Sequence, residues 1–284
     1  MKDQDQAHDP FTRNLLARIA DALDRLAGTG AAADSDWHDA PAYVWDGARG
    51  RPVERIEAPD MALLQGIDRQ KDAVAANVAH HAAGHAAHDM LLWGARGMGK
   101  SALVRACVRK IQDEGGRIAL VQVASDALPT LTTLFARLGQ VDRQFIVYCD
   151  DLGFAEGDSG SSRLLRSWLD GGVEARPANV RLAVTSNRRA ITARHASEQD
   201  DPINPRDVVD DQLALADRFG LSLGFHACSQ DEYLQIVHGY AAHYGLEVVE
   251  ADALEWSKRR GARSGRVAWH YITELAARAG RALG

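Results

Sequence analysis

The sequence predicts an α/β protein with a five-stranded parallel sheet, helices on both faces of the sheet and a helical lid at the C-terminal end. Short apolar runs alternate with segments of helical periodicity between residues 90 and 225, as in a parallel sheet that is covered on both faces. A glycine-rich loop follows the first of these runs, and only helical patterns follow the last. The 284 residues, of which 46% are apolar, suffice for one large or two modest domains.

The loop at residues 94–101 carries the pattern Gly-x-x-x-x-Gly-Lys-Ser between a predicted strand and a predicted helix. Its glycines let successive N–H groups point inward, and the helix adds unpaired first-turn donors and a positive dipole end. The loop therefore predicts a phosphate-binding site, in which Lys100 reaches the β- and γ-phosphates and Ser101 coordinates Mg²⁺. A chance match is the alternative, which the strand-turn-helix context disfavours. The predicted nucleotide-binding residues are Ile67, Gly94, Ala95, Arg96, Gly97, Met98, Gly99, Lys100, Ser101 and Ala102.

Polar side chains follow two later strands. Asp150 and Asp151 come directly after the apolar run at residues 145–149, where the carboxyl edge of a parallel sheet would bring them to the nucleotide. We expect Asp150 to hold Mg²⁺ and Asp151 to orient the attacking water. Asn187 ends the strand that begins at Val180, and its amide is suited to the γ-phosphate or to that water. The alternative for Asn187 is an ordinary residue of a strand-ending turn.

Two features upstream of the loop leave alternatives open. Ile67 precedes a helix expected over residues 68–83, and contact with a nucleotide base and plain core packing fit it equally well. The end of this helix is rich in histidine, with His80, His81, His85 and His88. Their spacing would allow a metal site, but Gly84 interrupts the run and no carboxylate or thiolate accompanies it, so a solvated helix end is favoured.

The chain divides into three predicted parts. Residues 1–42 hold an amphipathic helix, with its apolar stripe between Phe11 and Leu26, and a linker rich in Gly, Ala and Asp. Residues 43–227 form the α/β domain, which begins with two short alternating segments at residues 43–45 and 55–57. Residues 228–284 form the lid, whose first helix starts at a Ser-x-x-Glu capping box at Ser229.

Charge and cysteine content limit the possible partners. The net charge is -6, from 33 basic and 39 acidic residues, so nothing in the overall charge indicates a polyanion-binding protein. One basic cluster at residues 258–266 is suited either to nucleic acid or to ATP phosphates. Three isolated cysteines and the lack of a signal peptide or an apolar membrane helix predict a cytoplasmic protein that does not span a membrane.

The order of these motifs resembles AAA+ ATPases. It is most similar to the uncharacterised family called domain of unknown function 815, over roughly residues 45–283. The segments that carry this resemblance are Gly66-Ile67-Asp68-Arg69-Gln70-Lys71, Leu91-Leu92-Trp93-Gly94-Ala95-Arg96-Gly97, Thr185-Ser186-Asn187-Arg188-Arg189 and Leu215-Ala216-Asp217-Arg218-Phe219-Gly220-Leu221. The resemblance implies an AAA+ P-loop NTPase in which Asn187 is the sensor 1 residue.

The resemblance also implies that Arg218 is an arginine finger offered to ATP in the next subunit, and that Arg266 is the sensor 2 arginine of the lid. A helix-capping role is the alternative for Arg218. The AAA+ pattern usually has Asp-Glu where this chain has Asp150-Asp151, and Glu156 is a candidate to compensate. We therefore expect Mg-ATP hydrolysis in a homo-oligomer, coupled to an unknown macromolecular partner. A nucleotide-gated adaptor with little turnover and a small-molecule kinase are the alternatives.

Overall fold

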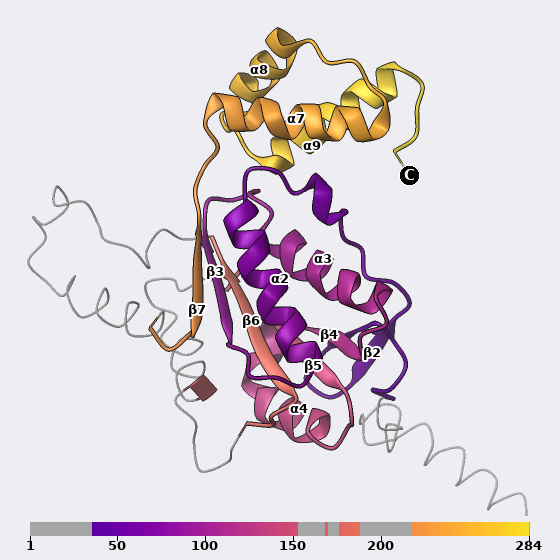
Figure 1. The fold of residues 1–284 in the computed structure, drawn as a ribbon, viewed down its shortest axis with the longest axis vertical. Helices are drawn as coiled ribbons and strands as arrows, with labels where there is room; N and C mark the ends of the chain where they lie inside the picture. Colours follow the sequence, from indigo (N-terminus) through magenta and orange to yellow (C-terminus); the bar gives the residue numbers. More distant parts are fainter. Residues whose placement is uncertain (1–35, 153–167, 170–175, 188–216, 284) are drawn as a thin grey trace, which may run out of the picture. The chain divides into compact units, whose positions relative to one another are not determined.

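The computed structural model describes residues 36–152, 168–169, 176–187 and 217–283. The centre of this part of the chain is a seven-stranded sheet with the strand order β2-β1-β4-β5-β6-β3-β7 (Figure 1). The strands are β1 Ala42–Trp45, β2 Gly50–Val53, β3 Met90–Gly94, β4 Ile118–Val123, β5 Gln144–Cys149, β6 Val180–Ser186 and β7 Leu221–Phe225.

The five predicted strands are all present as β3 to β7, and each runs parallel to its neighbours. The sheet continues beyond them, because β1 pairs in parallel with β4 and β2 pairs with β1 in the antiparallel direction. The short segment predicted at residues 43–45 is thus a strand, but the one predicted at residues 55–57 is not. Ile56 from this segment is instead buried in the hydrophobic core, although the backbone around it does not form a strand.

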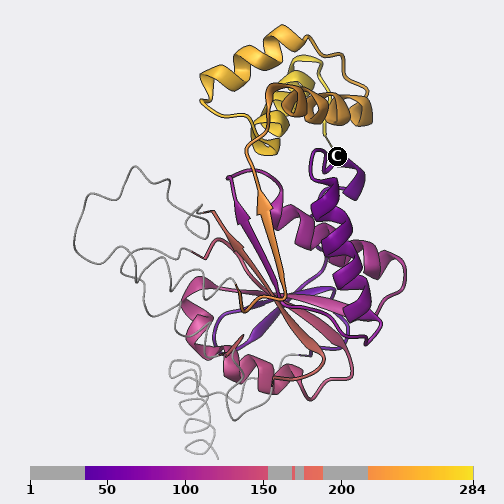
Figure 2. The ribbon, with the colours of Figure 1, turned by 60° about the vertical axis from the view of Figure 1, so that its left-hand side comes forward.

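Helices cover both faces of the sheet, as predicted (Figure 2). Helices α2, Asp68–Ala82, and α3, Lys100–Asp113, pack on one face, and α4, Leu131–Leu138, packs on the other. Side chains of β3, β4 and β5 alternate between the two hydrophobic clusters, as the two-residue period of a strand requires. Before α4 the chain forms a 3-10 helix, Ser125–Thr130, in which Pro129 lacks the N–H that an α-helical turn uses.

The predicted helical lid consists of α7, Gln230–Tyr244, α8, Glu250–Arg259, and α9, Gly265–Arg278. It follows β7 after a short connection and lies beyond the carboxyl ends of β3 and β7 (Figure 1). The capping box is confirmed, because the Ser229 hydroxyl accepts from the Glu232 N–H and the Glu232 carboxylate accepts from the Ser229 N–H. None of the described helices is long and apolar enough to cross a membrane.

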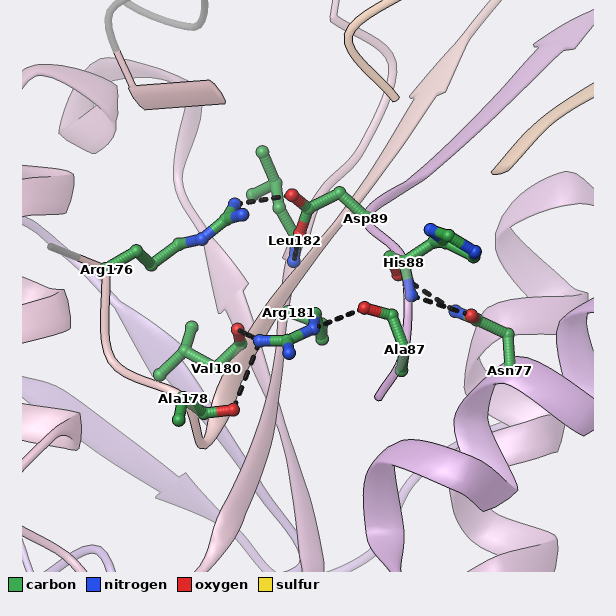
Figure 3. Close-up of polar contacts among 9 residues, drawn as sticks. All are labelled: Asn77, Ala87, His88, Asp89, Arg176, Ala178, Val180, Arg181 and Leu182. Carbon is green, nitrogen blue, oxygen red and sulfur yellow. Dashed lines mark hydrogen bonds and ion pairs between the residues drawn. The ribbon is translucent and has the colours of Figure 1, made fainter. Parts of the chain in front are cut away.

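A network of buried and half-buried polar groups fixes the amino end of β3 (Figure 3). The Asp89 carboxylate pairs with the Arg176 guanidinium at 2.6 Å and accepts the Leu182 N–H at 2.8 Å, which joins the start of β3 to β6. The Asn77 amide on α2 exchanges two hydrogen bonds of 2.9 Å with the backbone of His88. Because these contacts hold the amino end, the carboxyl end of β3 presents the glycine loop from a fixed position.

Several predictions fall outside the described residues. These are the amphipathic helix between Phe11 and Leu26 and the proposed compensating role of Glu156. The domain boundary expected between residues 227 and 228 also stays a prediction, since the chain from Trp37 onward groups into one compact unit.

Candidate functional site

A cavity of about 850 Å³ lies between the glycine loop, the ends of β5 and β6, the segment before α2 and the lid. Most of the residues predicted for the site line it together. These are Ile67, Gly97, Met98, Gly99, Lys100, Ser101, Ala102, Asp150, Asp151, Asn187 and Arg266. The predicted residues Gly94, Ala95, Arg96 and Arg218 do not line this cavity.

The glycine loop is held from two sides. Gly94 has φ +120°, and a Cβ there would lie 2.1 Å from the carbonyl oxygen of Phe225 on β7, which also accepts the Ala95 N–H at 2.7 Å. Gly97 has φ +74°, and a Cβ there would lie 2.8 Å from the Ser264 hydroxyl of the lid. Its carbonyl accepts the Arg266 N–H at 3.1 Å. The first helical turn of α9 thus contacts the glycine loop through the backbone.

The Lys100 side chain folds back over the loop. Its Nζ donates to the carbonyl oxygens of Gly94 at 2.9 Å and Ala95 at 2.8 Å, and to Asn187 Oδ1 at 3.0 Å. Burial lowers the pKa of Lys100 to about 8, against the opposing effect of the Asp151 and Asp150 carboxylates. The ammonium is thus a buried cation whose partners are oxygen atoms, and phosphate oxygens are suited to replace them.

The Asp150 carboxylate lies between the loop and β6. Its Oδ1 accepts from the Ser101 hydroxyl at 2.7 Å and from the Thr185 hydroxyl at 2.7 Å. Burial alone would raise the pKa of Asp150, but polar contacts from Tyr148, Thr185 and Ser101 outweigh it and hold this pKa below its ordinary value. Asp150 is therefore ionised near neutral pH, with an alcohol and a carboxylate oxygen side by side. Mg²⁺ prefers such oxygen ligands, so the donor set fits this ion.

Asp151 follows β5, Asn187 follows β6, and the two side chains meet in the cavity. The Asn187 Nδ2 donates to Asp151 Oδ1 while its Oδ1 accepts from Lys100. A cation, an amide and a carboxylate therefore form one continuous line of hydrogen bonds. The backbone of Asp151 has φ +50°, and no other non-glycine residue in the described ranges has a positive φ.

Aromatic side chains of the lid line the cavity and were not predicted for the site. Tyr240 of α7 and Trp269 of α9 are in edge contact, with ring centroids 5.4 Å apart. Ile67 is buried and also lines the cavity, so both of its interpretations, contact with a base and core packing, remain compatible with its position. Trp269 lies three residues after Arg266 on the same helical face, which is the signal that sequence reasoning missed.

The two predicted arginines lie in different places. Arg266 lines the cavity, whereas its neighbours in the basic cluster, Lys258, Arg259, Arg260 and Arg263, do not. In that cluster Arg260 stacks on Trp256 at 4.9 Å, and Arg259 pairs with Glu255. Arg218 is half-buried and precedes the amino end of β7, away from the glycine loop that follows β3.

The histidine-rich helix end is only partly solvated, which corrects the prediction. His81 is buried, and its Nε2–H donates to the Phe145 carbonyl oxygen at 3.1 Å. Burial lowers the pKa of His81 to about 4. Within the described residues no group of three His, Cys, Asp or Glu side chains is placed to hold a metal ion. All three cysteines are free and buried, and burial raises the pKa of Cys107 and Cys149 to about 12.

Comparison with known proteins places this geometry in a fold and a family. No curated protein matches the chain. Among solved structures, the Aeropyrum pernix Orc1 protein in complex with DNA is similar with a TM-score of 0.52, at 17% identity over 80% of this chain and 64% of that one. The Thermotoga maritima RuvB Holliday junction branch migration motor has a TM-score of 0.49, at 15% identity over 78% of this chain and 66% of that one.

The chain spans just under two thirds of the length of these two structures. The likeness to Orc1 shows the predicted AAA+ fold. The family described as "Protein of unknown function (DUF815)" matches residues 38–279, which is most of the chain, and the chain therefore belongs to this family.

Proposed function

We propose that the chain binds Mg-ATP in the cavity and hydrolyses it to ADP and phosphate, and that hydrolysis is coupled to remodelling or loading a macromolecular partner. The observation that carries this proposal is the line of hydrogen bonds from Lys100 through Asn187 to Asp151. The line passes beside the glycine loop and the Ser101–Asp150 pair. A γ-phosphate held by the loop would lie beside this line of hydrogen bonds, next to a cation, an amide donor and a carboxylate.

Each residue has a distinct role in this proposal. Lys100 exchanges the carbonyl oxygens of the loop for oxygens of the β- and γ-phosphates, and Asn187 keeps its position beside the γ-phosphate. The Asp151 carboxylate orients a water for in-line attack. Ser101 and Asp150 hold Mg²⁺, which when bound neutralises charge on the β- and γ-phosphates. Arg266 contacts the γ-phosphate from the lid.

Arg218 acts on ATP in a second copy of the chain, so the working form is a homo-oligomer. Met90 pairs with Leu221 and Gly94 pairs with Phe225, so β3 and β7 run side by side over their full length. Arg218 precedes this pair and the glycine loop follows it, and five residues of strand span roughly 16 Å at about 3.3 Å per residue. An arginine side chain does not bridge that length, and a contact with the subunit's own γ-phosphate is therefore disfavoured.

The second candidate function is a nucleotide-gated adaptor that binds ATP and scarcely hydrolyses it. The observation in its favour is Asp151 itself, which is one methylene shorter than the glutamate of the usual pattern. In the structure its carboxylate accepts a hydrogen bond from the Asn187 amide. A misplaced water-orienting group can cost orders of magnitude in rate, so slow turnover is compatible with the same site.

Calorimetric titration with Mg-ATP, together with analysis of the products, tests the proposal. The wild-type chain should bind Mg-ATP and release ADP and phosphate without a phosphorylated acceptor. Lys100→Ala should lose most of the affinity for Mg-ATP, because it removes the positive charge that contacts the β- and γ-phosphates. Lys110→Ala is the matched control: this lysine lies on the same helix but is exposed and pairs with Glu114 at 2.6 Å.

The outcomes separate the candidates. Unchanged affinity in Lys100→Ala would contradict the nucleotide site. Binding without phosphate release, with and without candidate partners, would favour the adaptor. A phosphorylated acceptor would favour a kinase.

A further inference from the structure

The hydroxyl of Thr185 joins the two acidic residues of the site. Thr185 lies near the end of β6 and is 1% exposed. Its Oγ1 donates to Asp150 Oδ1 at 2.7 Å and accepts the Asp151 N–H at 2.8 Å. A hydroxyl carries one hydrogen, so the donation to Asp150 leaves its lone pairs for Asp151. One oxygen atom thus fixes both a side chain and a neighbouring backbone group.

The backbone at Asp151 needs such support. Its φ of +50° is a left-handed conformation that costs a non-glycine residue about 1–2 kcal/mol, although aspartate tolerates it better than most. Thr185 contacts this turn twice, because its carbonyl oxygen also accepts the Leu152 N–H at 2.9 Å. Two successive N–H groups of the turn therefore bond to one residue of β6.

Packing alone does not require a hydroxyl at this position. Thr185 follows Ala183 and Val184 in a buried strand, and valine has nearly the same shape and a high preference for strands. The hydroxyl of a residue that is 1% exposed is favourable only because both of its hydrogen bonds are made. The presence of threonine is thus explained by its two acidic neighbours.

We propose that Thr185 is a positioning residue for ATP hydrolysis. It holds the Asp151 carboxylate at a set direction from Asp150, and so sets the water-orienting group relative to the magnesium ligand. Thr185 acts through the Asp151 backbone and through Asp150. This inference rests on the hydrolysis proposed above. In this proposal, Thr185 on the neighbouring strand β6 fixes how the Asp150 and Asp151 carboxylates are placed relative to each other.

Thr185→Val and Thr185→Ser test the proposal, because the first removes the hydroxyl at nearly constant shape and the second keeps it. Thr185→Val should lower kcat about 10- to 100-fold, with the Kd for Mg-ATP changed less than about threefold. Thr185→Ser should retain kcat within about threefold of wild type. A second readout needs no turnover: hydrogen exchange at the Asp151 amide in nucleotide-free protein should be faster in Thr185→Val than in wild type or Thr185→Ser.

Thr130→Val is the matched control. The Thr130 hydroxyl also joins two groups, as it accepts from Trp45 Nε1 at 2.8 Å and donates to the Ala127 carbonyl at 2.7 Å. It does not line the cavity. Its loss should lower the free energy of unfolding and leave kcat unchanged.

Three results would overturn the assignment. The first is wild-type kcat in Thr185→Val, even with faster exchange, since Thr185 would then only stabilise the fold. The second is loss of Mg-ATP affinity in parallel with kcat, which would make Thr185 a support for binding. The third is failure of Thr185→Ser to restore kcat. Lack of phosphate release by the wild type would instead contradict the proposed hydrolysis itself.

Discussion

Arg218 and Lys100 lie at opposite ends of two adjacent parallel strands. Arg218 precedes β7, Lys100 follows β3, and the two strands pair from Met90–Leu221 to Gly94–Phe225. Both residues are nevertheless expected to act on the γ-phosphate. They can do so only if the phosphate held by Lys100 of one copy meets Arg218 of another.

A mixing experiment tests this arrangement. Arg218→Ala should bind Mg-ATP normally and hydrolyse it slowly, because the charge of an arginine finger matters mainly in the transition state. Lys100→Ala should fail to bind but still present Arg218. An equal mixture should regain up to about one quarter of wild-type turnover. In a randomly assembled symmetric oligomer, about one quarter of the sites combine an intact Lys100 with an intact Arg218 from the neighbouring copy. No gain over the separate variants, or full activity of Arg218→Ala alone, would favour a helix-capping role.

Arg266 should link the nucleotide state to the lid. A contact from Arg266 on α9 to a γ-phosphate would stabilise one lid position over another, which is the differential contact that a conformational change requires. Hydrogen exchange across residues 229–283 should therefore differ between the ATP and ADP states, and Arg266→Ala should reduce the difference. Arg263→Ala is the control, as it belongs to the same basic cluster but does not line the cavity. Equal exchange in both states would contradict lid gating.

Asp151 should orient the water, although Glu156 offers a longer side chain. Asp151→Asn should keep Mg-ATP binding and lose most turnover, because the amide keeps the shape and removes the charge. Glu156→Gln should change turnover by less than about tenfold, or roughly 1.4 kcal/mol of barrier. Asp151→Glu should raise phosphate release if the reach of the side chain limits hydrolysis, and lower it if the turn held by Thr185 already suits the shorter side chain. Full activity of Asp151→Asn with loss in Glu156→Gln would reverse the assignment.

The buried His81 should make the fold sensitive to acid. Its pKa is about 4 in the folded chain and about 6.5 when unfolded, so the unfolded chain binds the extra proton between these values. Its contribution is complete above pH 6.5, and the free energy of unfolding then falls by up to about 1.4 kcal/mol per pH unit towards pH 4. Urea denaturation of His81→Gln should show a shallower decline over this range. His80→Gln, at an exposed position, should match wild type.

The sequence predicts most of the sheet because buried parallel strands are continuous apolar runs. Strands β3 and β5 lie where those runs lie, to within a residue. Strands β1 and β2, at one end of the sheet, were harder to predict, since they have four residues each. The position of β1 depends on its pairing with β4, 78 residues later in the chain, as in the pair Ala42–Leu120. Local pattern carries no information about such a contact.

The residues of the candidate site also divide into those that the sequence predicts and those that it does not. Lys100, Ser101 and Asp150 could be predicted because their motifs place them at the end of a strand or the start of a helix. The role of Thr185 could not, since a threonine in a strand has no local signature and its role arises from Asp150 and Asp151, which follow β5. His81 was missed although a signal existed: Val74, Val78 and His81 share one face of α2 at helical spacing, and that face is buried.

The close contact at Gly94 has a consequence for comparing relatives of this chain. A side chain there would strike the Phe225 carbonyl, and the positive φ also favours glycine, so the sheet requires Gly94 whether or not a nucleotide is ever bound. A descendant that had lost its ligand would still need this glycine, while selection on Lys100 and Asn187 would relax. The presence of Gly94 in a relative therefore indicates only that the relative has the same fold. The presence of both Lys100 and Asn187 is the better indicator of a functional nucleotide site.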